Sequence, residues 1–334
     1  MLESRHRVQA AICGPRGESF ARTSSPEAVT TFRSAAKPFQ LLPFVERGHF
    51  DRLGFSEEQL AVMCASHTGS AYHVGLVAGI LEQLGMSDRD LVCAFHEPLD
   101  GAARAQLRAR PEGRSTLYNN CSGKHAGMLA LARSEGWPTR GYEQPDHPLQ
   151  RLMLETVADL CGMRPEDVLT GIDGCGVPVF GVPLRAMAMS YARFATATDG
   201  GDSRSAALAR IRQAMMRFPV TTGGPERFST AIMQAAPEQI VSKGGAEGLE
   251  CLGIPGRALG LAVKCEDGHS RAVAPAVIEL LDTTGLLDTA VPGLESWRRP
   301  VTHNYAGLEV GGLGATVELL EPSRQAAVAG SGGR

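Results

Sequence analysis

The sequence has 334 residues, of which 43% are hydrophobic and 21% are charged, and its net charge is −3. This is an ordinary globular composition, and the interleaved acidic and basic residues give no reason to expect a nucleic-acid partner. No window approaches the roughly 20 apolar residues that span a bilayer, so we expect no membrane partner either.

The first predicted element is a hairpin over residues 7–23, in which two strand-like runs flank the turn Gly14-Pro15-Arg16-Gly17. Ser34 then marks the expected start of a helix, which Pro38 and Pro43 should bend or shorten. Ser34 and Lys37 lie one helical turn apart on one face. A buried lysine can lose its proton near neutral pH and activate a serine hydroxyl. Taken alone, the pattern is better explained by a helix-capping serine followed by a surface lysine.

Residues 56–59 (SEEQ) form a capping box, which predicts a helix over 59–65. A second helix is expected over 70–84, where Gly85 ends it. Between the two helices, Ser66 and His67 offer a hydroxyl and a neighbouring imidazole. The alternative is that His67 only complements the dipole at the helix end. The sequence leaves both interpretations open.

Residues 119–127 (NNCSGKHAG) gather a thiol, a hydroxyl, an amine, an imidazole and two carboxamides in one short segment. They follow a strand-like run over 116–118 and open a helix over 128–133. Packing does not explain this density of nucleophiles, bases and metal ligands. The segment therefore predicts an enzyme but does not by itself identify the reaction.

A second glycine-rich turn, residues 173–178 (DGCGVP), suggests a metal site. Cys121 and Cys175 are able to share a tetrahedral zinc ion, with Lys124 or His125 as the third ligand and water as the fourth. The spacing fits no standard zinc finger. Two buried thiols beside tight turns remain the alternative.

The apolar spacing of the second half predicts helices over 148–160 and 203–217. Strands are expected over 239–243, 258–265 and 306–310, and a core helix over 272–281. Lys243 ends the first of these strands before two glycines, as lysine does in the Lys-[Ser/Thr]-Gly motif of penicillin-recognising enzymes. A surface lysine before a turn is the alternative. Together with the N-terminal hairpin, these strands predict one sheet built from both chain ends.

We expect a single domain over 1–320 and a disordered Ala/Gly/Ser-rich tail over 321–334. Residues 1–7 lack the apolar core of a signal peptide. The eight cysteines are scattered without a CxxC pair, which is typical of a reducing compartment. These features predict a cytoplasmic protein.

Taken together, five motifs resemble the asparaginase II family, the type known from Rhizobium. They are SAAKPFQ (34–40), CASHTG (64–69), NNCSGKHAGML (119–129), DGCGVPVF (173–180) and VKCEDG (263–268). They occur in order along nearly the whole chain. The resemblance implies a mixed α/β (α+β) fold of the serine β-lactamase/glutaminase-like type, with an antiparallel sheet flanked by helices and a helical subregion. It also implies a homodimer that hydrolyses L-asparagine to L-aspartate and ammonia.

The resemblance further implies roles for individual residues. Ser34 and Lys37 match the first Ser-Lys pair, and Ser66 matches the serine of the second pair. We place its lysine partner at Lys243, with Lys264 as the competitor. We slightly prefer Ser34 to Ser66 as the nucleophile on the SxxK precedent, and expect Lys37 to act as the neutral base.

The same resemblance implies a zinc site and a substrate pocket. Cys121, Lys124 and Cys175 match zinc ligands, and His125 and Asp173 match positions that line the pocket. Two thiolates weaken zinc as a Lewis acid, so we expect it to position substrate rather than generate hydroxide. The alternatives are a related Ser-Lys amidohydrolase, of glutaminase or penicillin-recognising type, or a catalytically silent amino-acid-binding relative.

Overall fold

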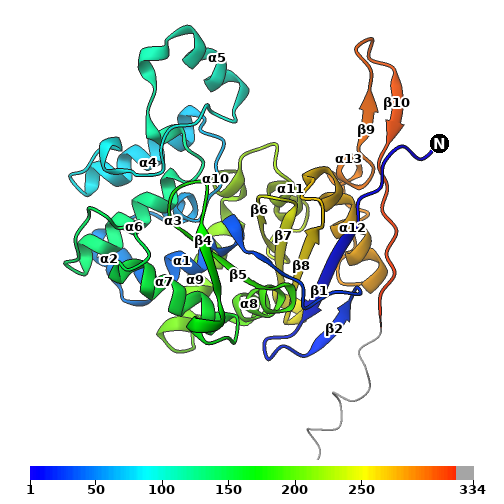
Figure 1. Ribbon diagram of the computed structural model, residues 1–334, viewed down its shortest axis with the longest axis horizontal. Helices are drawn as coiled ribbons and strands as arrows, with labels where there is room; N and C mark the ends of the chain where they lie inside the picture. Colours follow the sequence, from blue (N-terminus) through cyan, green and yellow to red (C-terminus); the bar gives the residue numbers. More distant parts are fainter. Residues whose placement is uncertain (321–334) are drawn as a thin grey trace, which may run out of the picture.

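The largest sheet of the molecule joins the two ends of the chain. The structure is a computed structural model that describes residues 1–320. The five strands of this sheet are antiparallel and run in the order β2-β1-β8-β7-β6. Their bounds are Val8–Cys13 (β1), Ser19–Arg22 (β2), Val241–Gly245 (β6), Leu249–Ile254 (β7) and Leu259–Cys265 (β8). The predicted hairpin and the predicted antiparallel sheet from both chain ends are confirmed (Figure 1). The strand expected over 306–310 is a correction, because the strand found there covers residues 309–312 and belongs to a separate two-stranded sheet. The tail predicted over 321–334 lies outside the described residues.

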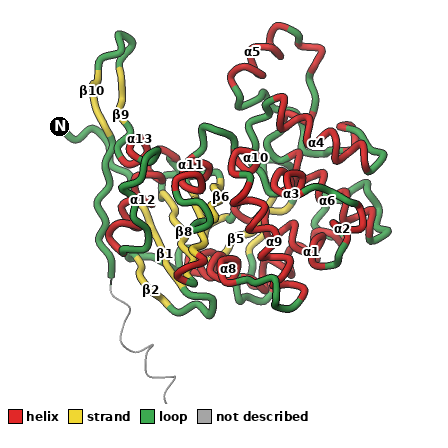
Figure 2. The backbone as a smooth tube through the Cα atoms, turned by 180° about the vertical axis from the view of Figure 1, so that it is seen from behind, coloured by secondary structure: helices red, strands yellow, loops and turns green. Residues whose placement is uncertain are grey.

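Helices cover both faces of this sheet. Helix α8 (Leu184–Thr196) packs on one face, and α12 (Val273–Thr284) on the other, with α11 (Phe228–Ala235) alongside (Figure 2). Successive strand residues point to opposite faces, so Ala11 joins the core under α8 while Ile12 joins the core under α12. A Cβ on Gly260 would lie 2.0 Å from the carbonyl oxygen of Ala188. Glycine there lets α8 touch the sheet backbone.

A helical region lies beside the sheet and surrounds α1. Helix α1 packs against α6, α7 and α9. The bounds of the helices in this region are Lys37–Glu46 (α1), His49–Leu53 (α2), Glu57–Met63 (α3), Ala71–Gln83 (α4), Gly101–Ala109 (α5), Ser122–Ser134 (α6), Pro148–Leu160 (α7), Ser203–Arg217 (α9) and Pro219–Gly223 (α10). Pro43 does not shorten α1 as predicted. Residues 37–45 are all buried, and their packing keeps the helix intact past the proline.

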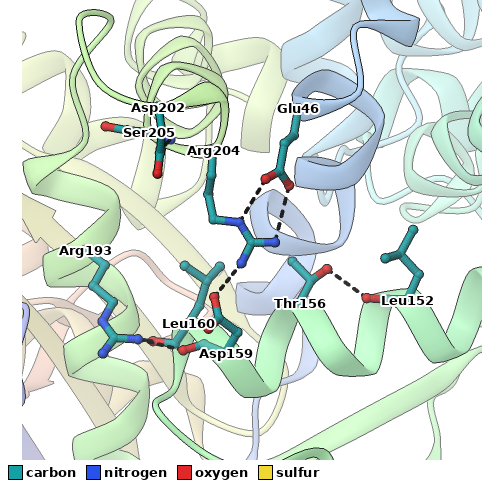
Figure 3. A network of polar contacts seen from close by, with 9 residues as sticks. All are labelled: Glu46, Leu152, Thr156, Asp159, Leu160, Arg193, Asp202, Arg204 and Ser205. Carbon is teal, nitrogen blue, oxygen red and sulfur yellow. Dashed lines mark hydrogen bonds and ion pairs between the residues drawn. The ribbon is translucent and has the colours of Figure 1, made fainter.

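One arginine links three of these helices (Figure 3). Arg204 of α9 donates to Glu46 at the end of α1, over 3.1 and 3.3 Å, and also to Asp159 of α7. Arg193 of α8 donates to the carbonyl oxygens of Asp159 and Leu160, over 2.6 and 3.1 Å. The network fixes α7 and α9 against α1, whose first residue is Lys37.

Two smaller sheets complete the fold. One has the order β3-β5-β4, with bounds Val29–Thr31 (β3), Pro178–Pro183 (β5) and Leu169–Ile172 (β4). The other is the hairpin of β9 (Val301–His303) and β10 (Glu309–Gly312), which follows α13 (Glu295–Arg298) and projects from the body (Figure 1). Within residues 1–320, no helix is long and apolar enough to cross a membrane.

Two further local predictions were wrong or incomplete. Residues 116–118 are not a strand but a 3₁₀ turn, begun by Ser115, whose side chain accepts from the backbone N–H of Leu117. Strand β7 was not predicted, because all six of its residues are buried and no polar alternation marks it.

Candidate active site

Ser66 lies between two buried lysines. It follows the C-terminal end of α3, while Lys37 opens α1 and Lys243 lies in β6. The Oγ of Ser66 is 3.0 Å from Nζ of Lys37 and 2.8 Å from Nζ of Lys243. The two lysines are only 1% and 3% exposed. A serine hydroxyl held by two desolvated amines is an arrangement suited to nucleophilic catalysis.

Lys37 has the surroundings of an ammonium group. Its Nζ donates to the carbonyl oxygen of Ala65 over 2.5 Å, to Ser66 Oγ, and to the carbonyl oxygen of Asn120 over 3.4 Å. Three acceptors match the three N–H donors of a protonated lysine. Lys37 therefore presents a positive charge to Ser66.

Lys243 has the surroundings of a neutral amine. Burial, followed by the positive charge of Lys37, lowers the pKa of Lys243 to about 7. Besides Ser66, its Nζ contacts only the carbonyl oxygen of Gly244, at 2.9 Å, among the described residues. An amine that is uncharged near neutral pH can accept the proton of the serine hydroxyl.

Ser34 and Lys264 are placed differently. Ser34 lies in a 3₁₀ turn directly before Lys37 and lines the same cavity as Ser66. Within residues 1–320, no hydrogen bond joins the Ser34 side chain to Lys37 or to Lys243. Lys264 pairs with Gln9 across the sheet, donates to the carbonyl oxygen of Cys265, and is not among the cavity-lining residues. The contacts favour Lys243 over Lys264 as the partner of Ser66.

The predicted metal ligands come together behind Ser66. The ligand atoms of Cys121, Asp173 and Cys175 all lie within 4.8 Å of one another, and Lys124 Nζ is 2.9 Å from Cys175 Sγ. Cys121 and Lys124 belong to the start of α6, and a Cβ on Gly123 would lie 2.1 Å from a carbonyl oxygen of α3. Glycine at this position brings the start of α6 against the end of α3, next to Ser66.

The charges of this cluster fit a bound cation. A hydrogen bond from the Cys175 thiol, with the charges of nearby lysines, lowers the pKa of Cys121 well below its ordinary value. Burial would lower the pKa of Lys124, but the negative charges of Cys121, Cys175 and Asp173 outweigh it and raise the pKa. Lys124 is thus the cation of the cluster. Two thiols and an amine at these separations are a donor set that suits tetrahedral zinc.

Asp173 forms a short ion pair with Arg33. Its Oδ1 is 2.8 Å from Nε of Arg33, and its side chain is 11% exposed. Burial would raise the pKa of Asp173, but the charges of Lys124 and Arg33 keep it below the ordinary value. Arg33 has a φ of 45°, in the left-handed region that a non-glycine residue rarely adopts. The surrounding structure therefore holds Arg33 in a strained conformation beside Ser34.

His125 lies behind the cavity rather than in its wall. Its side chain is fully buried, and Nδ1 is 2.7 Å from the hydroxyl of Tyr142. It is not among the cavity-lining residues, and its Nε2 has no hydrogen-bond partner within residues 1–320. The expected direct contact of His125 with substrate has no support in this arrangement.

The cavity that contains Ser66 also contains residues that the sequence did not single out. Its volume is about 650 Å³. Glu250 lies in its wall, buried, and accepts from Ser229 and Ser242 over 2.6 and 2.7 Å. Arg227 lies at its exposed side. A lone acidic residue inside the apolar run LECLGI was the one available signal for Glu250.

Comparison with known proteins supplies the family. The family described as L-asparaginase II matches residues 1–315. The chain belongs to the asparaginase II family. This confirms the resemblance drawn from the five motifs. None of the curated proteins compared with it matches.

Solved structures show a distant likeness to this asparaginase II chain. Mglu in its tris and glutamate form is 16% identical over 85% of this chain and 60% of its own, with a TM-score of 0.47. Mglu in its native form in the presence of 4.3M NaCl is 17% identical over 85% and 63%, with the same TM-score. A beta-lactamase from Mycobacterium bovis is 16% identical over 77% and 86%, with a TM-score of 0.37. The chain thus spans about 60% of the length of the first of these proteins. At such TM-scores the likeness carries no argument about the site.

Proposed function

We propose that the protein is an L-asparaginase with Ser66 as its nucleophile. It would hydrolyse the side-chain amide of L-asparagine to L-aspartate and ammonia. The observation that carries the proposal is the position of Ser66 Oγ, 3.0 Å from one buried lysine amine and 2.8 Å from a second. Family membership supports amide hydrolysis as the reaction class, and the resemblance of the five motifs supports L-asparagine as the substrate.

The two lysines have different roles in the proposed mechanism. Neutral Lys243 takes the proton of Ser66 while Oγ attacks the amide carbon of asparagine. The ammonium group of Lys37 donates to Oγ and stabilises the negative charge that develops there. Lys243 then returns the proton to the nitrogen, the C–N bond breaks and ammonia leaves. Water hydrolyses the resulting ester and frees Ser66. The sequence led us to expect Lys37 as the base. The proposed mechanism instead assigns that role to Lys243.

Asparagine also carries an ammonium and a carboxylate group, which need partners of opposite charge. Asp173 is the candidate partner of the ammonium group, because Lys124 and Arg33 keep its carboxylate ionised, although Asp173, like His125, is not among the cavity-lining residues. Arg33, 2.8 Å from Asp173, is the matching candidate for the carboxylate. Asp173→Ala should raise KM for asparagine strongly, and an unchanged KM would exclude this role.

Cys121, Lys124 and Cys175 would hold a zinc ion in this proposal. When bound, zinc would supply a Lewis acid close to the amino-acid end of the substrate. Lys124 would bind zinc only as the neutral amine, so metal binding must displace its proton. Cys121→Ser should lose zinc from the purified protein, as measured by elemental analysis. Chelation should raise KM for asparagine much more than it lowers kcat. Loss of kcat at unchanged KM, restored by zinc, would contradict the positioning role.

The substrate is tested by measuring ammonia release from L-asparagine and L-glutamine, with nitrocefin as a third substrate. The proposal predicts that kcat/KM for asparagine exceeds that for glutamine by at least tenfold. Preference for glutamine would favour a glutaminase, and nitrocefin turnover a penicillin-recognising enzyme. Binding of asparagine without any turnover would favour a silent relative.

A further inference from the structure

The cavity at Ser66 extends well beyond the two lysines. Strand β6, which carries Lys243, packs against the 3₁₀ turn that carries Ser34 and against α11. The cavity accordingly has a polar end at Ser34, Ser66 and Asn120, and it continues past Lys243 toward α11, α12 and α13. Figures 1 and 2 both show α11, α12 and α13 on the side of β6 opposite to α6.

The far end of the cavity combines apolar side chains with charged ones such as Arg227, Glu247 and Arg271. Phe228 begins α11, Val273 begins α12 and Trp297 lies in α13, and all three line the cavity with Leu249 of β7. The rings of Phe228 and Trp297 are 5.6 Å apart between centroids. Phe228, Leu249 and Val273 are at most 8% exposed, so this wall is a fixed part of the core. We call these four residues the apolar arm.

Free asparagine does not account for the apolar arm. Asparagine is small and polar at every end, whereas a cavity of about 650 Å³ is in the range that holds drug-sized ligands. The candidate partners of its ammonium and carboxylate groups are Arg33, which directly precedes Ser34, and Asp173, which pairs with Arg33. Neither is among the cavity-lining residues, so they would act from beside the polar end. A substrate held next to Ser34 with its side-chain amide at Ser66 would have its amide nitrogen near Lys243, and a group on that nitrogen would enter the arm.

We infer that the enzyme also accepts β-aspartyl amides whose amide nitrogen carries an apolar, preferably aromatic, group. This inference rests on the proposed function and names a second substrate class for the same site. Water is the only co-reactant that this hydrolysis needs. Ser66 Oγ bonds to the amide carbon, the C–N bond breaks, and Lys243 gives its proton to the departing primary amine in place of ammonia. Water then hydrolyses the ester to L-aspartate.

The test compares two ligands that carry a phenyl ring at different ends, N4-benzyl-L-asparagine and Nα-benzoyl-L-asparagine. Benzylamine release from the first should proceed with kcat/KM within about tenfold of that for asparagine, whereas the second should be neither bound nor hydrolysed. Trp297→Ala should lower the ratio of kcat/KM for N4-benzyl-L-asparagine over asparagine by about tenfold or more. Trp137→Phe, which changes the other tryptophan of the chain, should leave that ratio unchanged.

A binding readout separates this inference from the proposed function. In the Trp137→Phe protein, Trp297 is the single tryptophan, and N4-benzyl-L-asparagine should change its fluorescence on binding. If asparagine is hydrolysed but N4-benzyl-L-asparagine neither binds nor reacts, the inference is overturned while the proposed function stands. Acceptance of Nα-benzoyl-L-asparagine instead would overturn it as well. If neither asparagine nor N4-benzyl-L-asparagine is hydrolysed yet the fluorescence responds to N4-benzyl-L-asparagine, the proposed function fails and the arm remains a binding site.

Discussion

At the scale of single residues, two side chains of opposite charge shift the pKa of Lys243 in opposite directions. The negative charge of buried Glu250 raises the pKa of Lys243, and the positive charge of Arg227 lowers it, against a background set by burial and Lys37. If neutral Lys243 is the base, kcat/KM should rise with pH through about 7, since the free enzyme becomes active as Lys243 loses its proton.

The two charges give a matched pair of variants. Glu250→Gln removes a charge that favours protonated Lys243, so the acidic limb of kcat/KM should move to lower pH. Arg227→Gln removes a charge that disfavours protonation, so the limb should move to higher pH. Each shift should be on the order of one pH unit or less. pH–rate profiles of the three proteins measure this, and shifts in the same direction would exclude Lys243 as the titrating base.

The individual site residues differ in how far the sequence could predict them. Ser66, Lys37 and Lys243 lie in recognisable motifs, and all three were identified as candidate catalytic residues. The SxxK spacing led us to prefer Ser34 as the nucleophile, but that spacing does not show where the lysine amine lies. In the structure the amines of Lys37 and Lys243 contact Ser66, which favours Ser66 instead. Glu250 has no motif, since a buried carboxylate is functional only through neighbours that the fold brings to it.

At the scale of elements, close approach of α6 to α3 places the thiol cluster beside Ser66. Gly123→Ala would put a Cβ 2.1 Å from Val62 O, a contact that forces the two helices apart. We expect a loss of about 1–3 kcal/mol in the free energy of unfolding and a loss of activity at temperatures where the variant is folded.

Gly75 of α4 is the matched control, because nothing outside its own helix lies within 4 Å of the position a Cβ would take. Gly75→Ala should stabilise the protein by about 0.5–1 kcal/mol through helix propensity and leave the activity unchanged. Chemical denaturation and ammonia release measure both variants. Equal stability of the two would show that Gly123 is not needed for the contact between α6 and α3.

The accuracy of the element predictions follows from the strength of the local signal. The helices over 148–160 and 203–217 were predicted to the residue, because amphipathic periodicity and first-turn residues mark them. Strand β7 and helix α8 were missed. All six residues of β7 are buried, so no polar alternation marks that strand. Helix α8 does keep Arg185 and Arg193 on a less buried side, so its pattern was available and was not used.

At the scale of the whole molecule, the site depends on contacts between distant parts of the chain. Lys37 and Ser66 are 29 residues apart, and Ser66 and Lys243 are 177 apart. The sequence could supply the candidates and the sheet from both chain ends. It could not supply the strand register that directs Lys243, rather than Lys264, to Ser66.

The hairpin β9–β10 bears on the predicted homodimer. Its residues are exposed, including Val301 at 45% and Val310 at 61%, and Leu308 between the strands is 64% exposed. A lone two-stranded hairpin is at best marginally stable in water, and exposed apolar side chains favour association. We therefore expect a homodimer in which the partner covers this hairpin.

Sedimentation measurements test this prediction. Val310→Asp should shift the protein from dimer to monomer with little change in circular dichroism. Leu169→Asp, which places the same charge on an exposed leucine of β4, should leave the dimer intact. A monomeric parent protein, or dissociation by Leu169→Asp alone, would exclude the hairpin as the interface.

The central claim is that Ser66 attacks the amide of asparagine. Its most direct test is rapid acid quenching of the enzyme during turnover of L-asparagine, followed by peptide mass spectrometry. The account predicts one aspartyl group in ester linkage on Ser66, and loss of both this adduct and ammonia release in Ser66→Ala. An adduct on Ser34, or ammonia release by Ser66→Ala at the parent rate, would contradict it.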